Sequence, residues 1–266
     1  MLLRGTALHA GGEVSVELSR SRGPIVWAQR GREVLLPDAV VARADRGVTL
    51  ASHDGLVRID LVEHLLAACA GLGIRDGIRI RTDDDELPLL DGGARSFAEA
   101  LRAIDAPARP SPLRVAHEAS FDAEGACYRF RPGPLAVRVE VEFPPPIGRE
   151  DAAWHGDPED FITRIAPART FGWASEHAAL LAAGRARAVD LASVIVLDAA
   201  GPIAACRPNA PGEIARHKLL DLLGDLGFYG GPPEGSIDAW RPGHAATHRI
   251  VADALRSGVL VARSER

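Results

Sequence analysis

Apolar and polar residues alternate with a period of two in several short segments of the chain. The clearest are residues 14–18 (Val-Ser-Val-Glu-Leu), 78–81 (Ile-Arg-Ile-Arg) and 137–143 (Val-Arg-Val-Glu-Val-Glu-Phe). Because successive side chains of a strand point to opposite faces, this pattern predicts strands in sheets that are covered on one side only. Residues 128–131 (Tyr-Arg-Phe-Arg) are predicted to pair with 137–143 across the Pro-Gly-Pro turn at 132–134.

Other segments have the longer spacing and the flanking residues of helices. Asp60 is predicted to open one helix, and Ser96 and Glu99 form a capping-box pattern at the start of another. Residues 157–158 (Asp-Pro) have the N-cap and first-turn identities of a third. The first two of these helices are predicted over residues 60–72 and 97–104. Two more helices are predicted over 211–226 and 243–255, and a buried strand over 194–197.

Strands are followed by helices twice along the chain, on either side of a proline-rich stretch at residues 105–112. A length of 266 residues is long for one core and sufficient for two domains of ordinary size. The order predicts an α+β protein with two domains, residues 1–108 and 109–266, each a β-sheet layered against two α-helices.

The composition excludes several classes of protein. The formal net charge is −5, so no basic excess favours nucleic acid as a partner. The N-terminus lacks the apolar core of a signal peptide, and no stretch approaches the length of a membrane span. We therefore expect a cytoplasmic protein, and a monomer. The acidic run at 83–86 is predicted to be a solvated turn, and the three cysteines, Cys69, Cys127 and Cys206, to be buried and unpaired.

The predicted helix over 211–226 carries the strongest chemical signal. His217 and Asp221 are four residues apart, so their side chains lie on one face, and Asp225 lies one turn further along. This spacing allows a helix to offer two ligands to one metal ion. The alternative is a His–Asp pair that binds no metal.

A second signal lies in the predicted helix over 60–72, where Glu63 precedes His64. Adjacent side chains of a helix point about 100° apart, so His64 could bind a metal while Glu63 reaches a water beside it as general base. The alternative is that Glu63 and Asp60 form a capping box. His244 and His9 are ambiguous from sequence alone, and the other histidines, at positions 53, 117, 155, 177 and 248, are predicted to be ordinary.

Together, His64, His217 and Asp221 predict a catalytic zinc site with a fourth position open for water. Iron(II) also suits two histidines and one carboxylate. The sequence has no phosphate-binding loop, no serine nucleophile motif and no dinucleotide-binding fingerprint.

Six motifs follow one another along the chain. They lie at residues 62–68 (Val-Glu-His-Leu-Leu-Ala-Ala), 70–74, 86–92, 168–172 (Ala-Arg-Thr-Phe-Gly), 216–226 (Arg-His-Lys-Leu-Leu-Asp-Leu-Leu-Gly-Asp-Leu) and 243–245 (Gly-His-Ala). In this order and spacing they resemble one family, the zinc-dependent UDP-3-O-acyl-N-acetylglucosamine deacetylases of lipid A biosynthesis. The resemblance implies a zinc site between two α+β domains, and deacetylation of an acylated UDP-amino sugar.

The resemblance also implies a role for each site residue. His64, His217 and Asp221 would bind zinc and Glu63 would act as the general base. His244, held by Asp225, would stabilise or protonate the tetrahedral intermediate, and Thr170 would donate a hydrogen bond to its oxyanion. Lys218, the only lysine of the chain, would contact the sugar nucleotide, and Phe171 would pack against it.

The chain departs from the family pattern at residues 188–193. The family has Gly-Gly-Ser-x-Asp-Asn where this chain has Ala-Val-Asp-Leu-Ala-Ser. Because that segment borders the passage for the acyl chain in the family, a diverged deacetylase of another N-acyl sugar or sugar nucleotide is the alternative function. A non-catalytic relative that binds a ligand is a further alternative.

Overall fold

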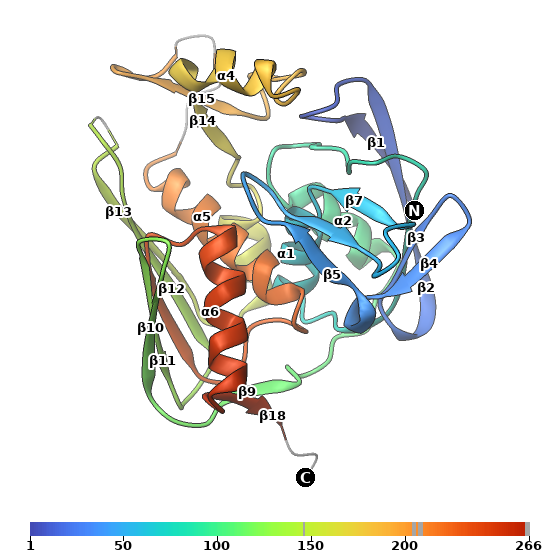
Figure 1. Ribbon diagram of the computed structural model, residues 1–266, viewed down its shortest axis with the longest axis vertical. Coiled ribbons are helices and arrows are strands. Elements are labelled where there is room, and N and C mark those ends of the chain that lie inside the picture. Colours follow the sequence, from blue (N-terminus) through green and yellow to red (C-terminus); the bar gives the residue numbers. More distant parts are fainter. Residues whose placement is uncertain (146, 204–205, 207–209, 264–266) are drawn as a thin grey trace.

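The computed structural model describes residues 1–145, 147–203, 206 and 210–263, in which helices lie between two five-stranded sheets (Figure 1). The first sheet has the order β1-β2-β8-β3-β4 and the second β10-β11-β17-β12-β13. The first sheet contains β1 (Leu2–Thr6), β2 (Glu13–Pro24), β3 (Val26–Gln29), β4 (Arg32–Leu35) and β8 (Asp76–Thr82). The second contains β10 (Ala119–Ala123), β11 (Ala126–Arg131), β12 (Ala136–Glu142), β13 (Arg149–Trp154) and β17 (Ser236–Trp240).

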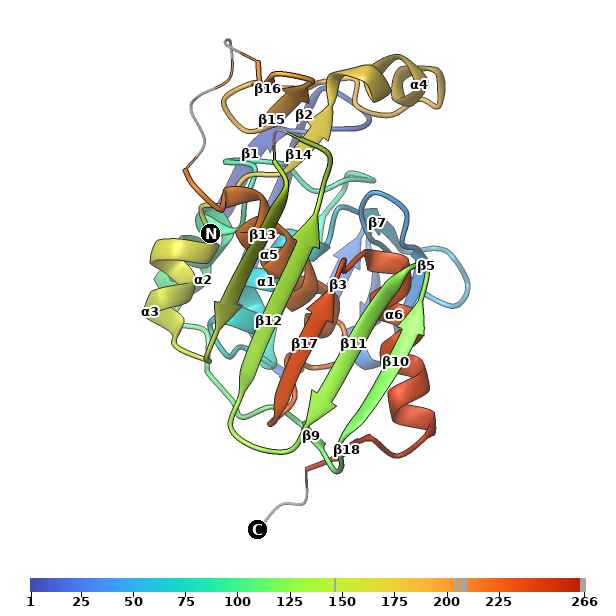
Figure 2. The ribbon, with the colours of Figure 1, turned by 90° about the vertical axis from the view of Figure 1, so that its left-hand side faces the viewer.

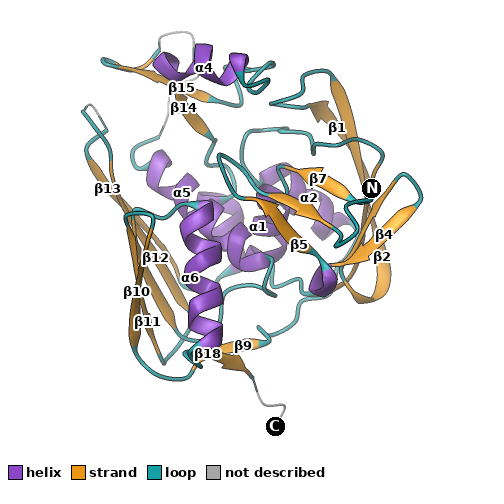
Figure 3. Ribbon diagram, in the orientation of Figure 1, coloured by secondary structure: helices purple, strands orange, loops and turns teal. Residues whose placement is uncertain are grey.

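The central helices lie between the inner faces of the two sheets, whereas the helix over His177–Ala182 lies apart from them (Figure 3). The two central ones, α1 and α5, pack against each other. The mixed architecture confirms the predicted α+β fold class. The helices are α1 (Glu63–Gly71), α2 (Arg95–Ala103), α3 (Pro158–Asp160, continued by a π-helical turn over Phe161–Ile165), α4 (His177–Ala182), α5 (Glu213–Gly227) and α6 (His244–Arg256).

Three smaller sheets complete the fold. One lies before α1, another lies near α4, and a third joins the C-terminal strand to the start of the second half. They consist of β5 (Val40–Arg43), β6 (Thr49–Ala51) and β7 (Arg58–Asp60); of β14 (Phe171–Trp173), β15 (Ile195–Asp198) and β16 (Gly201–Pro202); and of β9 (Leu113–Val115) and β18 (Leu260–Ala262). One cluster of buried apolar side chains runs through both halves, and the domain boundary at residue 108 stays a prediction.

Alternation along the strands has the predicted consequence for burial. In β12, Val137, Val139 and Val141 are buried, whereas Arg138 lies exposed on the other face. The apolar face is the one that the helices cover, and the strand order is visible from its other side in Figure 2. Burying these three valines contributes roughly 1.5–3 kcal/mol each.

The predicted hairpin between residues 128–131 and 137–143 is wrong. Strand β17 lies between β11 and β12, antiparallel to β11 and parallel to β12. Its inward side chains, Ile237 and Ala239, continue the apolar face of the sheet. Five residues that enter a sheet from far along the chain leave no local signal, because parallel pairing needs a long crossover rather than a tight turn.

The predicted starts of two helices are also wrong. Asp60 ends β7, and its carboxylate accepts hydrogen bonds from Arg43 and Thr49, so α1 begins only at Glu63. No capping box precedes α2, whose N-cap is Ala94. The predicted helix start at residues 157–158 is confirmed. Asp157 is the N-cap, and its side chain accepts a hydrogen bond from the backbone N–H of residue 159.

Two smaller predictions, on the exposure of the acidic run at 83–86 and on the burial of Cys127, are wrong. Glu86, in the run predicted to be solvated, is 3% exposed, and its carboxylate accepts hydrogen bonds from the backbone N–H groups of His9 and Ala10. Cys127 is only half-buried, whereas Cys69 and Cys206 are buried as predicted. Within the described ranges, no helix is long and apolar enough to cross a bilayer.

The approach of α1 to α5 depends on two glycines. A Cβ at Gly224 would lie 2.2 Å from the carbonyl oxygen of Glu63, and one at Gly227 would lie 2.8 Å from that of Leu66. Real Cβ atoms do not approach backbone so closely, and the obstacle is not a flexible side chain. Glycine at both positions therefore sets the distance between the two central helices.

We predict that Gly224→Ala lowers the free energy of unfolding by about 2 kcal/mol. Overpacking costs about 1–3 kcal/mol, and the better helix propensity of alanine returns at most about 1 kcal/mol. Urea unfolding followed by circular dichroism measures the change. Gly172→Ala is the control, because a Cβ there meets nothing within 4 Å. An equal effect of the two variants would contradict the prediction.

Candidate metal centre and active site

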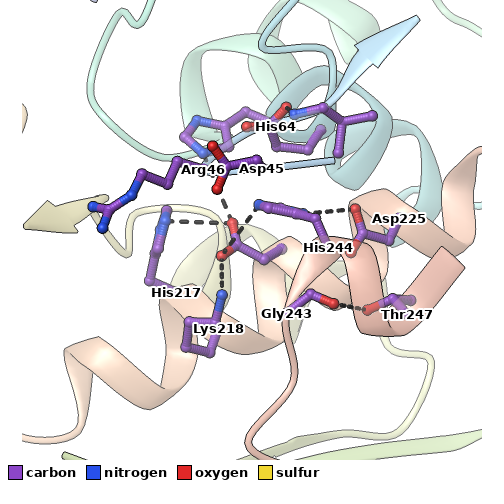
Figure 4. A network of polar contacts seen from close by, with 12 residues as sticks. Asp45, Arg46, His64, His217, Lys218, Asp225, Gly243, His244 and Thr247 are labelled. Atoms are coloured by element: carbon purple, nitrogen blue, oxygen red, sulfur yellow. Dashed lines mark hydrogen bonds and ion pairs between the residues drawn. The ribbon is translucent and has the colours of Figure 1, made fainter. Parts of the chain in front are cut away.

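Two histidines and one aspartate meet between α1 and α5 (Figure 4). The nearer oxygen of Asp221 lies 3.4 Å from Nε2 of His217 and 4.0 Å from Nε2 of His64. One ligand atom from each residue lies within 4.8 Å of the others, and all three residues are buried. The structure thus brings together the three predicted ligands, which come from both halves of the chain.

Helix geometry and one strained turn place these side chains. His217 and Asp221 stand one turn apart on α5, as predicted from their spacing. In the first half, Leu61 has a φ of +58°, which is uncommon for a residue with a side chain and turns the backbone from β7 into α1. His64 therefore lies in the first turn of α1 and faces α5.

Hydrogen bonds orient both imidazoles for metal binding. Nδ1 of His217 lies 3.0 Å from the carbonyl oxygen of Ala168, so it donates that hydrogen bond and leaves Nε2 as a free ligand atom. The backbone of Gly93 hydrogen-bonds to His64. Burial lowers the pKa of both histidines, that of His64 to about 3, so both are neutral, as metal ligands must be.

The third ligand is an ionised carboxylate. Burial alone would raise the pKa of Asp221, but the charge of Lys218 and the imidazoles of His217 and His244 hold it well below its usual range. Nζ of Lys218 donates a hydrogen bond of 2.7 Å to the second oxygen of Asp221. One ionised carboxylate, paired with Lys218, and two neutral imidazoles suit a divalent cation such as zinc.

Glu63 lies beside this cluster and is 2% exposed. One carboxylate oxygen accepts a hydrogen bond of 2.9 Å from the backbone N–H of Val48. Burial raises the pKa of this carboxyl to about 7. The alternative in which Glu63 and Asp60 form a capping box is wrong, because α1 has no side-chain cap.

His244 begins α6 and contacts two carboxylates of α5. Its Nδ1 lies 2.8 Å from Oδ1 of Asp225, and its Nε2 lies 3.9 Å from Oδ2 of Asp221. Burial alone would lower the pKa of His244, but the charge and hydrogen bond of Asp225 raise it to about 9. The histidine that was ambiguous from sequence is therefore part of the cluster, with a side chain that is only 10% exposed.

These residues line a cavity of about 710 Å³. Thr170 and Phe171 form part of its wall beside α5, and the ring of Phe171 lies edge-on to His217 with centroids 6.0 Å apart. One part of the wall, away from the candidate metal ligands, is apolar. It contains Leu180, Val189, Leu191, Val194, Val196 and Ile203.

Ion pairs join the two halves beside this apolar part. Arg46, from the loop between β5 and β6, pairs with Glu176 through two hydrogen bonds of 2.7 and 3.2 Å. Arg185 is buried and donates hydrogen bonds to the carboxylate of Asp45 and to Nε2 of His9. Burial and the charge of Arg185 lower the pKa of His9 to about 4, so this second ambiguous histidine is a neutral acceptor.

Two further residues near the cluster were missed. His248, predicted to be ordinary, lies beside Asp225, with Nε2 3.6 Å from Oδ1. Its spacing of four from His244 on a helix was a usable signal. His177, also predicted to be ordinary, lines the cavity, and its distance in sequence from every other site residue gave no signal.

The fold and the cluster are typical of one class of protein, the α+β metalloenzymes, with a candidate ligand set that comes from helices of both halves. The donor set fits a divalent ion, because a neutral imidazole pair and an ionised carboxylate converge with their ligand atoms oriented inward.

Comparison with known proteins specifies the family. The profile of the UDP-3-O-acyl N-acetylglycosamine deacetylase family, LpxC, matches residues 1–256, and the chain belongs to this family. It is 32% identical to the UDP-3-O-acyl-N-acetylglucosamine deacetylase of Myxococcus xanthus, over 94% of this chain and 82% of that protein. It is 34% identical to the protein of the same name from Synechocystis sp., over 96% and 97% of the two chains. The corresponding Nitratidesulfovibrio vulgaris protein is 33% identical, over 91% and 80%.

We predict that Asp221→Asn weakens zinc binding at least 100-fold, because it removes an anionic ligand and leaves Lys218 without its partner. Asp225→Asn, on the same face of α5, is the matched control and should change zinc affinity less than tenfold, since Asp225 is outside the ligand cluster. Competition with a chromophoric chelator measures both affinities. Equal losses would show that Asp221 is not a ligand.

Proposed function

We propose that the protein is a zinc-dependent amidohydrolase that removes the acetyl group from UDP-3-O-(3-hydroxyacyl)-N-acetylglucosamine, in lipid A biosynthesis. The observation that carries the proposal is the buried cluster of His64, His217 and Asp221 beside Glu63 and His244, in one cavity with an apolar extension. Membership in the LpxC family supports the same reaction. Iron(II) would suit the same ligands.

In the proposed reaction, water adds to the acetyl carbonyl, the C–N bond breaks, and acetate and a free amine are released. A zinc ion held by the three ligands would supply Lewis acidity and make water more acidic. Glu63 takes the proton of the attacking water as general base and returns it to the leaving nitrogen. Its position in the cavity wall next to His64 supports this role.

Two donors serve the negative charge that develops on the carbonyl oxygen. His244, held by Asp225, presents Nε2 toward Asp221 and the ligand cluster. The hydroxyl of Thr170, in the cavity wall, donates the second hydrogen bond. Both are in place before substrate binds, because Asp225 is buried and the backbone N–H of Thr170 donates to Gly92.

The rest of the cavity is proposed to bind the substrate. Lys218 would contact the sugar nucleotide with its compact positive charge, and Phe171 would pack against the substrate. The apolar wall beyond Phe171 would take up the 3-O-acyl chain. We keep the predictions that the protein acts in the cytoplasm and as a monomer, with no nucleic acid as partner.

The alternative substrate, another N-acyl sugar or sugar nucleotide, is motivated by the changed sequence at residues 188–193. Val189 and Leu191 of the divergent segment at 188–193 line the apolar wall. Apolar side chains there preserve room for an alkyl chain, and this supports the acylated substrate over the alternative. A non-catalytic relative would have no use for a buried carboxylate beside the ligand cluster.

We predict that Glu63→Gln lowers kcat for acetate release by about 10²- to 10⁴-fold, because the amide cannot accept a proton. The substitution keeps the shape of the side chain and an oxygen for Val48, so zinc content should stay at one equivalent. Glu99→Gln, on the surface of α2, is the control. Undiminished turnover by Glu63→Gln would support the non-catalytic alternative or a different base.

We also predict that kcat/KM rises with the length of the 3-O-acyl chain until the apolar wall is filled. Each buried methylene contributes about 0.8 kcal/mol, so two additional methylenes should give about a tenfold increase. Acetate release from substrates with acyl chains of increasing length, and from UDP-N-acetylglucosamine itself, measures this dependence. Full activity without an acyl chain would favour the alternative substrate.

A further inference from the structure

His248 lies on α6 one turn after His244, so both imidazoles face α5. They approach the same oxygen of Asp225: Nδ1 of His244 at 2.8 Å and Nε2 of His248 at 3.6 Å. The side chain of Asp225 is 1% exposed and that of His248 is 10% exposed. Asp225 is thus held between two histidines, of which the proposed reaction uses only His244.

The surroundings of His248 indicate which of its nitrogens carries a proton. Its Nδ1 lies 3.0 Å from the hydroxyl of Tyr229. Its Nε2 is fully buried and has no hydrogen-bond partner within 3.5 Å among the described residues. It faces the carboxylate of Asp225, whose Oδ1 lies 3.6 Å away. A lone pair of Nε2 facing a carboxylate oxygen would be repulsive, so Nε2 carries the proton and points it at Asp225.

Aromatic contacts hold the ring of His248 in this place. The ring of Phe228 packs edge-on against it with centroids 5.8 Å apart, and that of Tyr229 lies 5.6 Å away. Both aromatic residues follow directly after α5, the helix that carries Asp225. The position of His248 is therefore fixed by the same segment of chain whose carboxylate it approaches.

We propose that His248 is a positioning residue for the deacetylation: it holds the carboxylate of Asp225 against Nδ1 of His244 and so aims His244 at the reacting carbonyl. A carboxylate with a single donor can rotate about its Cβ–Cγ bond, whereas a second donor directed at the same oxygen restrains that rotation. The expected change in kcat rests on the proposed function. The restraint on the Asp225 carboxylate rests only on the geometry of α5 and α6.

A double-mutant cycle tests the inference. His248→Phe removes the donor and keeps a ring, and His248→Gln keeps a donor near the position of Nε2. Each is made in the wild-type chain and in His244→Ala, with the zinc-loaded enzyme. We expect His248→Phe to lower kcat about 10- to 100-fold with KM within about twofold, and His248→Gln to recover most of that loss. In the His244→Ala background, His248→Phe should have no further effect on kcat.

A second readout does not require turnover. The Nδ1 proton of His244, hydrogen-bonded to Asp225, should give a low-field imidazole resonance in NMR spectra of ¹⁵N-histidine-labelled protein. That resonance should broaden or shift upfield in His248→Phe and persist in His248→Gln. If the wild-type chain releases no acetate, the proposed function fails while this spectrum still tests the role of His248.

Two results would overturn the inference. One is the same loss of kcat from His248→Phe in both backgrounds, together with a lower melting temperature, which would mean a purely structural role. The other is wild-type kcat and an unchanged resonance in His248→Phe. If His248→Phe does not fold, Tyr229→Phe takes its place in the cycle, because it removes the hydroxyl at Nδ1 and leaves the ring packing intact.

Discussion

The site depends on the close approach of α1 to α5, which two glycines of α5 permit. With Gly224 against the backbone of Glu63, the first turn of one helix lies beside the middle of the other. His64, from the first half of the chain, thereby comes within 4.0 Å of Asp221, from the second. A larger residue at the crossing would separate Glu63 and His64 from His217 and Asp221. The contact of Gly224 with the backbone of Glu63 therefore determines both how α1 packs on α5 and how the site residues are placed.

This contact also buries an unusual number of ionisable groups, which would be unfavourable if they were not paired. Lys218 of α5 pairs with Asp221, and His244 of α6 pairs with Asp225, so each buried carboxylate has a positively charged partner. Buried pairs of this kind add little net stability, because desolvation offsets their attraction. Their value lies in a fixed electrostatic environment, which does not have to reorganise during a reaction.

The sequence predicted the parts of the molecule whose signals are local. His217 and Asp221 were found because helical spacing places them on one face, and β12 because alternation reports a one-sided strand. The insertion of β17 between β11 and β12 was missed, since pairing between distant segments has no local pattern. The burial of Glu86 was missed for the same reason, because its partners His9 and Ala10 lie in a distant loop. The roles of Thr170 and Phe171 came from resemblance alone.

The divergent segment at residues 188–193 ends at a contact that ties the apolar wall to the metal ligands. A Cβ at Gly92 would lie 1.7 Å from the carbonyl oxygen of Ser193, whose hydroxyl donates to the carbonyl of Leu90. The same loop accepts a hydrogen bond from the backbone of Thr170 and meets His64 through Gly93. The contacts of Ser193 with Gly92 and Leu90 thus hold the end of the segment beside the site, and they do not involve the side chains of Val189 and Leu191, which line the wall. An alkyl chain is recognised by shape and apolar area rather than by directed hydrogen bonds, so the segment can change its sequence while the catalytic groups keep their geometry.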